Sequence, residues 1–412
     1  MKPAVMRVGV FHPGTQNSWQ RAVAFQEAGM LAWYATSLHF PADGAVLRWA
    51  ARVPGAAGRR LRRLLARRSS ELLEAQHLRR MGWLPPAAIA ARRLGRADLA
   101  RRLDALGDRR FGRSVTRLAA REPVDALWTH DGRALEAFRW AKPRGIACVL
   151  DQSIPHPRAL NAVLRAERAR DPEALRHWTP ASSAVIARAD AEIALADRVV
   201  VGSQFAYHTM IVEGCPAKKL RLVPYGWDET LFPDAPPVRP PLQGRPLELL
   251  FVGTVCARKG VGPLLVAMAL LPPGLARLTL LGRLELPESL LRRPDVCHRP
   301  QVPRAEVPEY MRAADVLVLP SLFEGGGIVL YEALASGLAI VQSRHCGDGV
   351  QDGANGLVLD AVAPAAIAAA IHAAADPEWL ARWQAASWAR RESRSWAAYR
   401  RRLPAVLEGL GR

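Results

Sequence analysis

Residues 321–337 read SLFEGGGIVLYEALASG, and the run ADVLVLP at residues 314–320 stands directly before them. The apolar run closed by proline predicts a short buried strand, and the residues after the glycines have the apolar periodicity of a helix. A glycine loop between strand and helix exposes backbone N–H groups at the helix N-terminus, where phosphate is stabilised and the missing Cβ allows close approach. Glu324 would repel phosphate but accept hydrogen bonds from hydroxyl groups. The stretch therefore predicts a site for a phosphorylated ligand that also carries hydroxyls.

Strand-like and helix-like patterns alternate along the 412 residues of the chain. This alternation is typical of an α/β protein with mainly parallel, doubly wound sheets. The first apolar run ends in the turn HPGTQ at residues 12–16, at a strand's carboxyl end, where open α/β sheets bind their ligands. We expect the basic region, residues 48–121, to be helical. We expect strands at residues 5–11, 32–36, 126–129, 146–150, 198–201, 248–252, 277–281 and 316–319.

A proline-rich segment divides the chain. Residues 232–246 read FPDAPPVRPPLQGRP, and proline at this density continues neither a helix nor a central strand. We therefore predict a Rossmann-like first domain, a short linker and a Rossmann-like second domain, over residues 1–235, 236–246 and 247–385.

Glu324 and Glu332 belong to a set of motifs that follow one another in a fixed order. The others read ADRVVVGS at residues 196–203, LRLVPYGWD at 220–228, FVG at 251–253 with RKG at 258–260, and EVPEYMRAAD at 306–315. With the E-x7-E spacing of the two glutamates, the chain resembles the GT4-type retaining glycosyltransferases (glycosyl transferases group 1). The resemblance implies the α/β GT-B fold, with two doubly wound Rossmann-like domains facing a central cleft. It also implies that the last helix, in residues 386–412, crosses back to the first domain.

The resemblance implies a role for each motif residue at a nucleotide-sugar donor. Glu324 would be catalytic and accept hydrogen bonds from the transferred sugar, while Glu332 would hold the ribose. Lys259, also counted as catalytic, and Arg258 would bind the diphosphate and stabilise it as it leaves. The residues expected to contact the donor are Gly14, Gly253, Thr254, Arg258, Lys259, Val302, Gly326, Gly327, Ile328 and Glu332.

Plainer interpretations of these residues stay open. Arg258 and Lys259 alone would be an ordinary solvated pair, and Glu332 is also a carboxylate favoured near a helix N-terminus. Two positions depart from the family's usual pattern. The family usually has arginine where this chain has Thr254, and an aromatic or similarly bulky residue where it has Gly326.

His130 ends a strand-like run in the stretch LWTHDG at residues 127–132. It aligns with a histidine that many family members place beside the sugar, which implies a catalytic role in binding a sugar hydroxyl and orienting the acceptor. A purely structural histidine is the alternative. Gly14 lies where the family's first-domain loop meets donor and acceptor.

The resemblance implies transfer of a hexosyl unit, with retention, from a nucleotide-diphosphate sugar to a hydroxyl acceptor. A saccharide or lipid-linked acceptor in cell-envelope synthesis would bind the first domain. The chain contains no Asp-x-Asp pair, so neither a metal nor another cofactor is expected. Two other classes stay open: a GT-B-like sugar-nucleotide epimerase and a non-catalytic nucleotide-sugar binding protein.

The net charge of +19 is concentrated in residues 48–121, where 20 arginines face five acidic residues. Such a region, with RRLRRLLARR at residues 59–68, would attract an anionic membrane surface. Arginine-rich helix faces that are merely solvated are the equally favoured alternative. Nucleic acid is not expected as a partner because no recognised nucleic-acid module surrounds the region.

The five cysteines are scattered, which favours a reduced, cytoplasmic protein. Binding to the inner face of the membrane would follow if the basic region contacts lipid.

Overall fold

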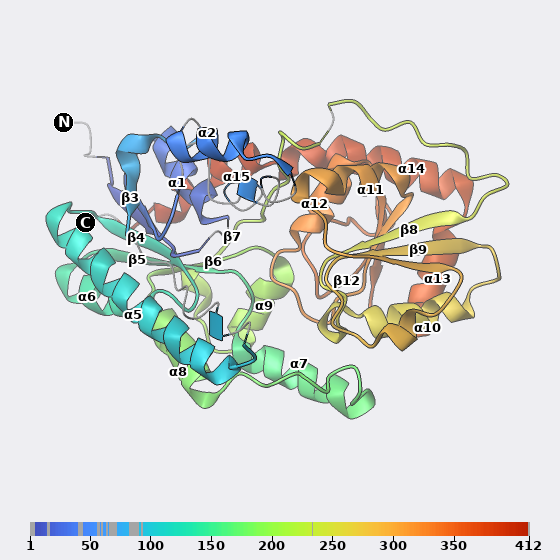
Figure 1. The fold of residues 1–412 in the computed structure, drawn as a ribbon, viewed down its shortest axis with the longest axis horizontal. Helices are drawn as coiled ribbons and strands as arrows, with labels where there is room; N and C mark the ends of the chain where they lie inside the picture. The colour runs from blue at the N-terminus through green and yellow to red at the C-terminus, as the bar shows by residue number, and fades with distance from the viewer. Residues whose placement is uncertain are drawn as a thin grey trace.

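The computed structural model describes residues 5–14, 17–39, 44–55, 58, 61–62, 65, 72–81, 90–91, 94–232 and 234–410. Two parallel sheets lie side by side, each covered by helices (Figure 1). The predicted division into residues 1–235, 236–246, 247–385 and 386–412 stays a prediction.

The first sheet has the strand order β3-β2-β1-β4-β5-β6-β7, and its paired strands are parallel. Strands buried on both faces read as continuous apolar runs, and Trp33 and Trp128 are almost fully buried between sheet and helices. The order reverses between β1 and β4, which is where doubly wound sheets bind ligands. The strands are β1 Val8–Phe11, β2 Leu31–Thr36, β3 Leu78–Arg80, β4 Ala126–His130, β5 Ala147–Gln152, β6 Arg198–Val201 and β7 Leu220–Leu222.

The helices around this sheet supply the crossovers that parallel strands require. Their described bounds are α1 Ser18–Glu27, α2 Ala45–Arg52, α5 Ala97–Arg121, α6 Leu135–Ala141, α7 Pro157–Arg170, α8 Ser183–Leu195 and α9 Gln204–Val212. The expectation that residues 48–121 are helical throughout is wrong at β3, which pairs with β2 from Tyr34 to Thr36. This strand is only three residues long, so its sequence, Leu-Arg-Arg, carries no strand periodicity. Most of the stretch 59–68 lies outside the described residues.

The second sheet has the order β10-β9-β8-β11-β12-β13 and reverses between β8 and β11. Its strands are β8 Leu247–Val252, β9 Ala276–Leu281, β10 Val296–Arg299, β11 Val316–Leu319, β12 Ala339–Ser343 and β13 Gly356–Leu359. Its helices are α10 Val261–Leu270, α11 Val307–Ala313, α12 Ile328–Ala335, α13 Pro364–Ala374 and α14 Pro377–Arg390. The loops that follow β8 and β11 therefore meet at one edge of the sheet.

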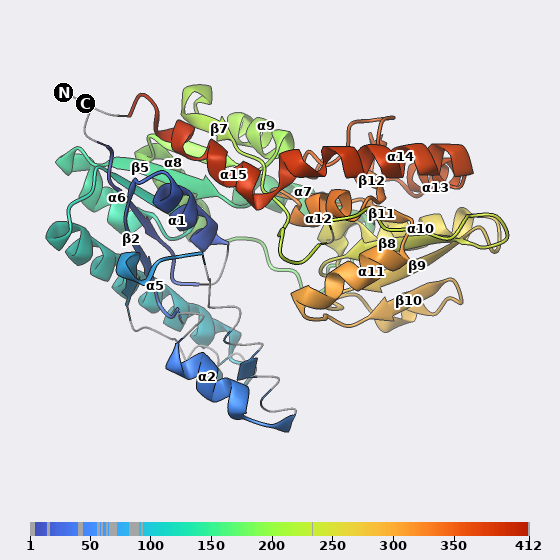
Figure 2. The ribbon, with the colours of Figure 1, turned by 90° about the horizontal axis from the view of Figure 1, so that it is seen from above.

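The end of the chain returns to the first domain. Helix α15 (Trp396–Arg402) lies beside α1, where Arg400 contacts Glu27 at 3.0 Å and donates a hydrogen bond to Gln20, also at 3.0 Å (Figure 2). On the way, Trp227 pairs with residues 394–396 through two backbone hydrogen bonds of 2.9 and 3.0 Å. The helix breaks between α14 and α15, where residues 391–394 form a single 3-10 turn.

The proline-rich segment is docked on the second domain. The guanidinium of Arg239 donates hydrogen bonds to the carbonyl oxygens of Ala314 and Ser336, each at 2.7 Å, and of Gly337 at 3.1 Å. Burial lowers the pKa of Arg239 to about 10.

In the described part of the chain, no helix is long and apolar enough to cross a membrane.

Candidate functional site

The glycine loop joins β11 to α12 and is pinned by residues that come from the first half of the chain. Gly327 has φ of 57°, a left-handed conformation that glycine adopts without strain. A Cβ on Gly325 would lie 1.9 Å from the carbonyl oxygen of Ser153, and the Ser203 hydroxyl donates a 2.5 Å hydrogen bond to the Gly325 carbonyl. The backbones of the two halves therefore meet at this loop, and only glycine fits the contact.

Glu324, at the start of the loop, is ion-paired with Lys259 and lies 3.5 Å from the Arg258 guanidinium. Arg258 and Lys259 both lie on the turn after β8. This turn contacts the segment before the glycine loop, since the Arg258 carbonyl accepts a 2.8 Å hydrogen bond from the Leu322 amide. Burial by itself raises the pKa of Glu324, but Lys259 and then Arg258 outweigh it and leave the pKa below its ordinary value. The motif residues of the two loops thus form one cluster in which the carboxylate is ionised at neutral pH.

Glu332 is buried on α12 and holds a partner that the sequence did not indicate. Its carboxylate accepts a 3.0 Å hydrogen bond from Arg304, which follows β10. Burial raises the pKa of Glu332, and Arg304 acts in the opposite direction. Val302, two residues before Arg304, is half-buried against the core of the second domain. The only feature of the sequence that could have indicated this pair is Arg304 itself, a basic residue that follows the short and weakly apolar strand β10.

His130 is buried at the carboxyl end of β4. Its Nδ1 lies 3.6 Å from Asp151, beyond hydrogen-bond distance, and both ring nitrogens are buried without a hydrogen-bond partner among the described residues. The His12 ring packs against it edge-on, with ring centroids 5.0 Å apart. A buried imidazole with unmet hydrogen-bonding capacity is suited to a ligand hydroxyl.

Asp151, at the end of β5, is the centre of a buried polar network that sequence reasoning missed. The Arg21 Nε donates to one carboxylate oxygen at 2.7 Å, and the Tyr225 hydroxyl donates to the other at 3.4 Å. Burial by itself raises the pKa of Asp151, but Arg21 and His130 outweigh it and hold the pKa well below its ordinary value. The Arg21 guanidinium lies between the Tyr225 and Tyr399 rings, 5.2 and 5.1 Å from their centroids. The charge is therefore paired, as burial requires.

Tyr225 links this network to the glycine loop. A Cβ on Gly326 would lie 2.5 Å from Cδ2 of the Tyr225 ring, so the ring occupies the space beside Gly326. A second route passes through Ser153, whose amide and hydroxyl donate to Asp131 at 2.9 and 2.6 Å. The Gly325–Gly326 turn is thereby connected through single residues to the segment that carries His130.

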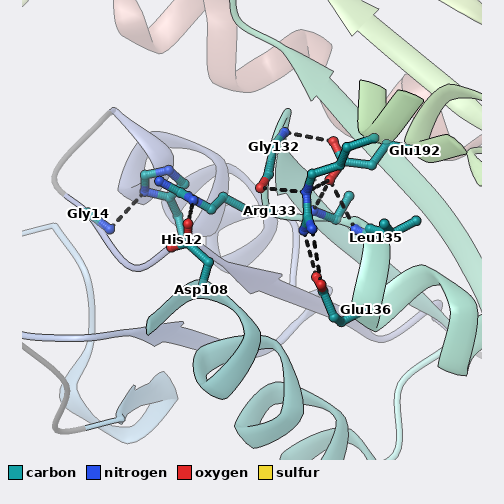
Figure 3. A network of polar contacts seen from close by, with 10 residues as sticks. His12, Gly14, Asp108, Gly132, Arg133, Leu135, Glu136 and Glu192 are labelled. Carbon is teal, nitrogen blue, oxygen red and sulfur yellow. Dashed lines mark hydrogen bonds and ion pairs between the residues drawn. The ribbon is translucent and has the colours of Figure 1, made fainter. Parts of the chain in front are cut away.

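The loop after β4 is held by hydrogen bonds and an ion pair. The Glu192 carboxylate accepts hydrogen bonds from the amides of Gly132, Ala134 and Leu135 at 2.7, 3.0 and 3.1 Å, which satisfies the free N–H groups at the start of α6 (Figure 3). Arg133 pairs with Asp108 of α5, and His12 lies nearby in the same view. Burial, and then the charges of His130 and Arg133, hold the pKa of His12 well below its ordinary value, so His12 is neutral at neutral pH.

The remaining predicted site residues lie on segments that follow the carboxyl ends of strands. The Gly14 amide donates a 3.0 Å hydrogen bond to Nδ1 of His12, and the neighbouring Thr15 lies outside the described residues. Gly253 has φ of 145° on the turn after β8, and Thr254 beside it is half-buried. Ile328 is the first residue of α12. The structure brings Lys259, Arg258 and Glu324 together, whereas Gly14 and His130 stand on the first sheet.

At the donor site that the resemblance implies, Gly326→Ala is expected to lower donor turnover by about 10²-fold, because the added methyl group displaces the loop from the Tyr225 ring and small misplacements are costly. In a Tyr225→Ala background the Gly326→Ala substitution should lower turnover only slightly, because the ring that the methyl group would meet is absent. Gly262→Ala is the matched control, since its Cβ meets only one atom, at 4.0 Å. Equal losses from Gly326→Ala in both backgrounds would contradict the steric link.

Known proteins are similar to this chain in sequence and in fold. Residues 246–376 match the family model described as glycosyl transferases group 1. The amylovoran biosynthesis glycosyltransferase AmsK of Erwinia amylovora is 30% identical over 160 residues, which cover 35% of this chain and 39% of that protein. A D-inositol 3-phosphate glycosyltransferase of Acidothermus cellulolyticus is 32% identical over 218 residues, covering 47% of this chain and 48% of the relative. The matches span half or less of these curated relatives.

Solved structures agree over nearly the whole chain. HepE of Anabaena, in complex with UDP, superposes with a TM-score of 0.62 at 16% identity, covering 98% of this chain and 99% of that chain. Sucrose-phosphate synthase of Thermosynechococcus elongatus gives a TM-score of 0.63 at 18% identity with the same coverage. At these identities the likeness establishes the fold, which is GT-B as predicted. The family match to residues 246–376 and the glycosyltransferase relatives support the predicted likeness to the group 1 glycosyltransferases of the GT4 type.

Proposed function

We propose that this protein is a retaining glycosyltransferase that moves a hexosyl unit from a nucleotide-diphosphate sugar to a hydroxyl acceptor. The observation that carries the proposal is the cluster of Glu324, Lys259 and Arg258 at the glycine loop, which the first domain contacts through Ser153. Fixed cations beside a loop of backbone amides suit a diphosphate, and an ionised carboxylate next to them suits sugar hydroxyls.

Each group then has a chemical task. Lys259 and Arg258 would bind the diphosphate and stabilise the charge that develops as the sugar bond breaks. Glu324 would orient both Lys259 and the sugar, and Glu332 with Arg304 would hold the ribose. His130 would accept or donate a hydrogen bond to a sugar hydroxyl from the acceptor side, with Asp151 beside its Nδ1. The leaving phosphate would assist in deprotonating the acceptor, and contact between the two domains would exclude water.

The proposed chemistry places no metal on the diphosphate, since cationic side chains supply the charge. Transfer should therefore persist in excess EDTA. Loss of transfer with EDTA, restored by Mg²⁺ or Mn²⁺, would contradict this part of the proposal.

Lys259→Ala should weaken both donor binding and turnover, because the diphosphate would lose one of the two cations of the cluster. A panel of UDP-, GDP- and ADP-sugars tests this by thermal stabilisation, in which a donor at 100 times its Kd adds about 2.7 kcal/mol to the free energy of unfolding. Since HepE was solved with UDP, the UDP-sugars come first. One donor class should stabilise the wild type and Arg312→Ala, which changes an exposed cation of α11 outside the cluster, but not Lys259→Ala. Equal stabilisation of both variants would remove Lys259 from the site.

The acceptor is proposed to be an anionic saccharide or a lipid-linked saccharide used in cell-envelope synthesis, met at the cytoplasmic face of a membrane. On α5, Arg110, Arg113 and Arg117 line a pocket of about 380 Å³ together with Met81 and Phe111. Among the described residues no carboxylate pairs with Arg113 or Arg117, so their charges are available to a ligand or a surface. An arginine stripe beside apolar side chains suits phosphate-bearing lipid.

Reversing the charge of Arg113 and Arg117 with glutamate should weaken binding to phosphatidylglycerol vesicles at low salt, since each basic residue near such a surface contributes about 1 kcal/mol. The matched control reverses Arg165 and Arg168 of α7, which are also exposed. Co-sedimentation measures the difference, which added salt should diminish. Equal binding by the two double variants would contradict a membrane role for α5.

A further inference from the structure

A second basic pocket lies at the opposite edge of the first sheet from His130. It has a volume of about 590 Å³ and is lined by Lys142, Ala196, Asp197, Arg198, Lys218, Lys219, Arg221 and Leu410. Lys142 precedes β5, Arg198 begins β6 and Arg221 lies in β7, so these residues stand at the amino ends of their strands. Figure 1 shows the C-terminus at this end of the molecule, away from the second domain. The pocket is therefore separate from the candidate donor site.

The composition of the pocket is unusual for this chain. Arginine outnumbers lysine by 52 to five in the sequence, yet three of the five lysines, Lys142, Lys218 and Lys219, line this one pocket. A fourth is Lys259 of the donor cluster. Lysine presents a compact, mobile point charge that differs from the planar arginine fork. A general preference for arginine on solvated surfaces does not account for lysines gathered from two separate segments.

The positive charges of the pocket exceed its negative charge. Five basic side chains face one carboxylate, that of Asp197, which leaves a net +4. Asp197 is already occupied by Lys142 at 2.6 Å and by the Cys148 amide at 2.8 Å. Lys219 is used locally, because its Nζ donates to the Ala194 carbonyl at 2.9 Å at the end of α8. The charges of Arg198, Lys218 and Arg221 have no carboxylate partner among the described residues.

Arg198 also has an unmet hydrogen-bonding group. Its two terminal nitrogens donate to the carbonyl oxygens of Asp197 and Glu408 at 3.1 and 3.2 Å, but its Nε is buried and has no partner in the described structure. Burial, followed by the charge of Arg221, lowers the pKa of Arg198, and burial lowers the pKa of Lys219. Crowded cations of this kind are stabilised by an anion that accepts several hydrogen bonds.

We propose that this pocket binds a compound with two or more clustered phosphate groups, at a site distinct from the donor site. No aromatic side chain lines the pocket, so nothing there would stack on a nucleobase, and recognition would rest on the phosphates. The phosphates could belong to a free di- or triphosphate compound or to a phospholipid headgroup that carries two phosphates, as cardiolipin does. Both sources present the same chemistry, and the proposal holds whether or not the protein transfers sugars.

The test uses the full chain and tripolyphosphate as the probe. Calorimetry at low salt should show saturable binding to the wild type, with at least tenfold lower affinity in Lys218→Ala/Arg221→Ala. Lys259→Ala should keep this binding, which separates the pocket from the donor cluster. Circular dichroism checks that the variants are folded, and the exposed Lys218→Ala alone should give a smaller loss in the same direction.

A second arm compares vesicles that contain cardiolipin with vesicles of phosphatidylcholine. Binding to cardiolipin that falls in the pocket variant identifies a headgroup as the source, while tripolyphosphate binding without such a fall identifies a soluble compound. If the pocket variant binds both probes as the wild type does, or if tripolyphosphate binding disappears in Lys259→Ala, the proposal is overturned.

Discussion

Glu324→Gln is expected to lower the kcat of donor turnover by about 10²–10³-fold, the loss typical of removing one preorganised electrostatic contact. The amide keeps the size of the side chain but carries no charge, so it cannot neutralise Lys259. In the wild type the Glu324 carboxylate contacts both Lys259 and Arg258. The pKa of Glu324 lies below its ordinary value, so the wild-type group is ionised throughout the neutral range and the substitution removes a full charge. Steady-state kinetics with saturating donor measures the loss.

Glu309→Gln provides the matched control for this variant. Glu309 is exposed on α11 in the same domain, so the same chemical change should leave kcat unaltered. Circular dichroism and the thermal midpoint establish that both variants are folded. If Glu324→Gln turns over donor as fast as Glu309→Gln, Glu324 has no part in the chemistry.

Asp151→Asn is expected to destabilise the fold by about 3–5 kcal/mol, because it leaves the Arg21 guanidinium buried without its counter-charge. Arg21 is 2% exposed and Asp151 is fully buried, so water cannot replace the lost partner. Chemical denaturation at neutral pH measures the difference. The control is Glu173→Gln, since Glu173 and Arg176 form an exposed pair that contributes under about 1 kcal/mol. Similar losses in the two variants would contradict the assignment of Asp151 as a buried anchor.

The same pair gives the stability of the wild type an acid dependence. Because the pKa of Asp151 is depressed in the folded state, its contribution is fully present above the ordinary value of 3.8 and is lost as the pH falls below it. Asp151→Asn should therefore lose stability less steeply than the wild type between pH of about 4 and 2. Parallel curves would mean that Asp151 is not ionised in the folded protein.

The fold was predictable from local patterns. Apolar runs such as residues 316–319 and 248–252, alternating with helices and closed by glycine or proline, indicated parallel sheets before any contact was known. Lys259 and Glu324 were predicted from motifs on separate loops, and the structure places them in contact because β8 and β11 are neighbours in the sheet. Motifs that are far apart in the sequence therefore form one cluster because the strands before them are neighbours in the sheet.

Other features depend on long-range packing and left no local pattern. Arg21 and Asp151 are 130 residues apart, and neither belongs to a recognisable motif. The partnership of Tyr225 with Gly326 arises only where the connection between domains meets the glycine loop. The pair of Arg304 and Glu332 forms within the second domain, where the segment after β10 meets α12. The loop at Gly326 lacks the bulky residue usual in the resembling family, and the Tyr225 ring occupies the adjacent space. Sequence alone could not indicate which distant side chain would do so.

The most direct test of the proposed function follows the release of nucleoside diphosphate from UDP-, GDP- and ADP-hexoses by wild type, Glu324→Gln and Glu309→Gln. Without an added acceptor, slow hydrolysis of the bound donor reports the same bond cleavage as transfer. We predict release from one donor class by the wild type and by Glu309→Gln, and a loss of about 10²-fold or more in Glu324→Gln. Release that is equal in all three proteins, or no release from a donor that demonstrably binds at Lys259, would contradict a glycosyltransferase site at the glycine loop.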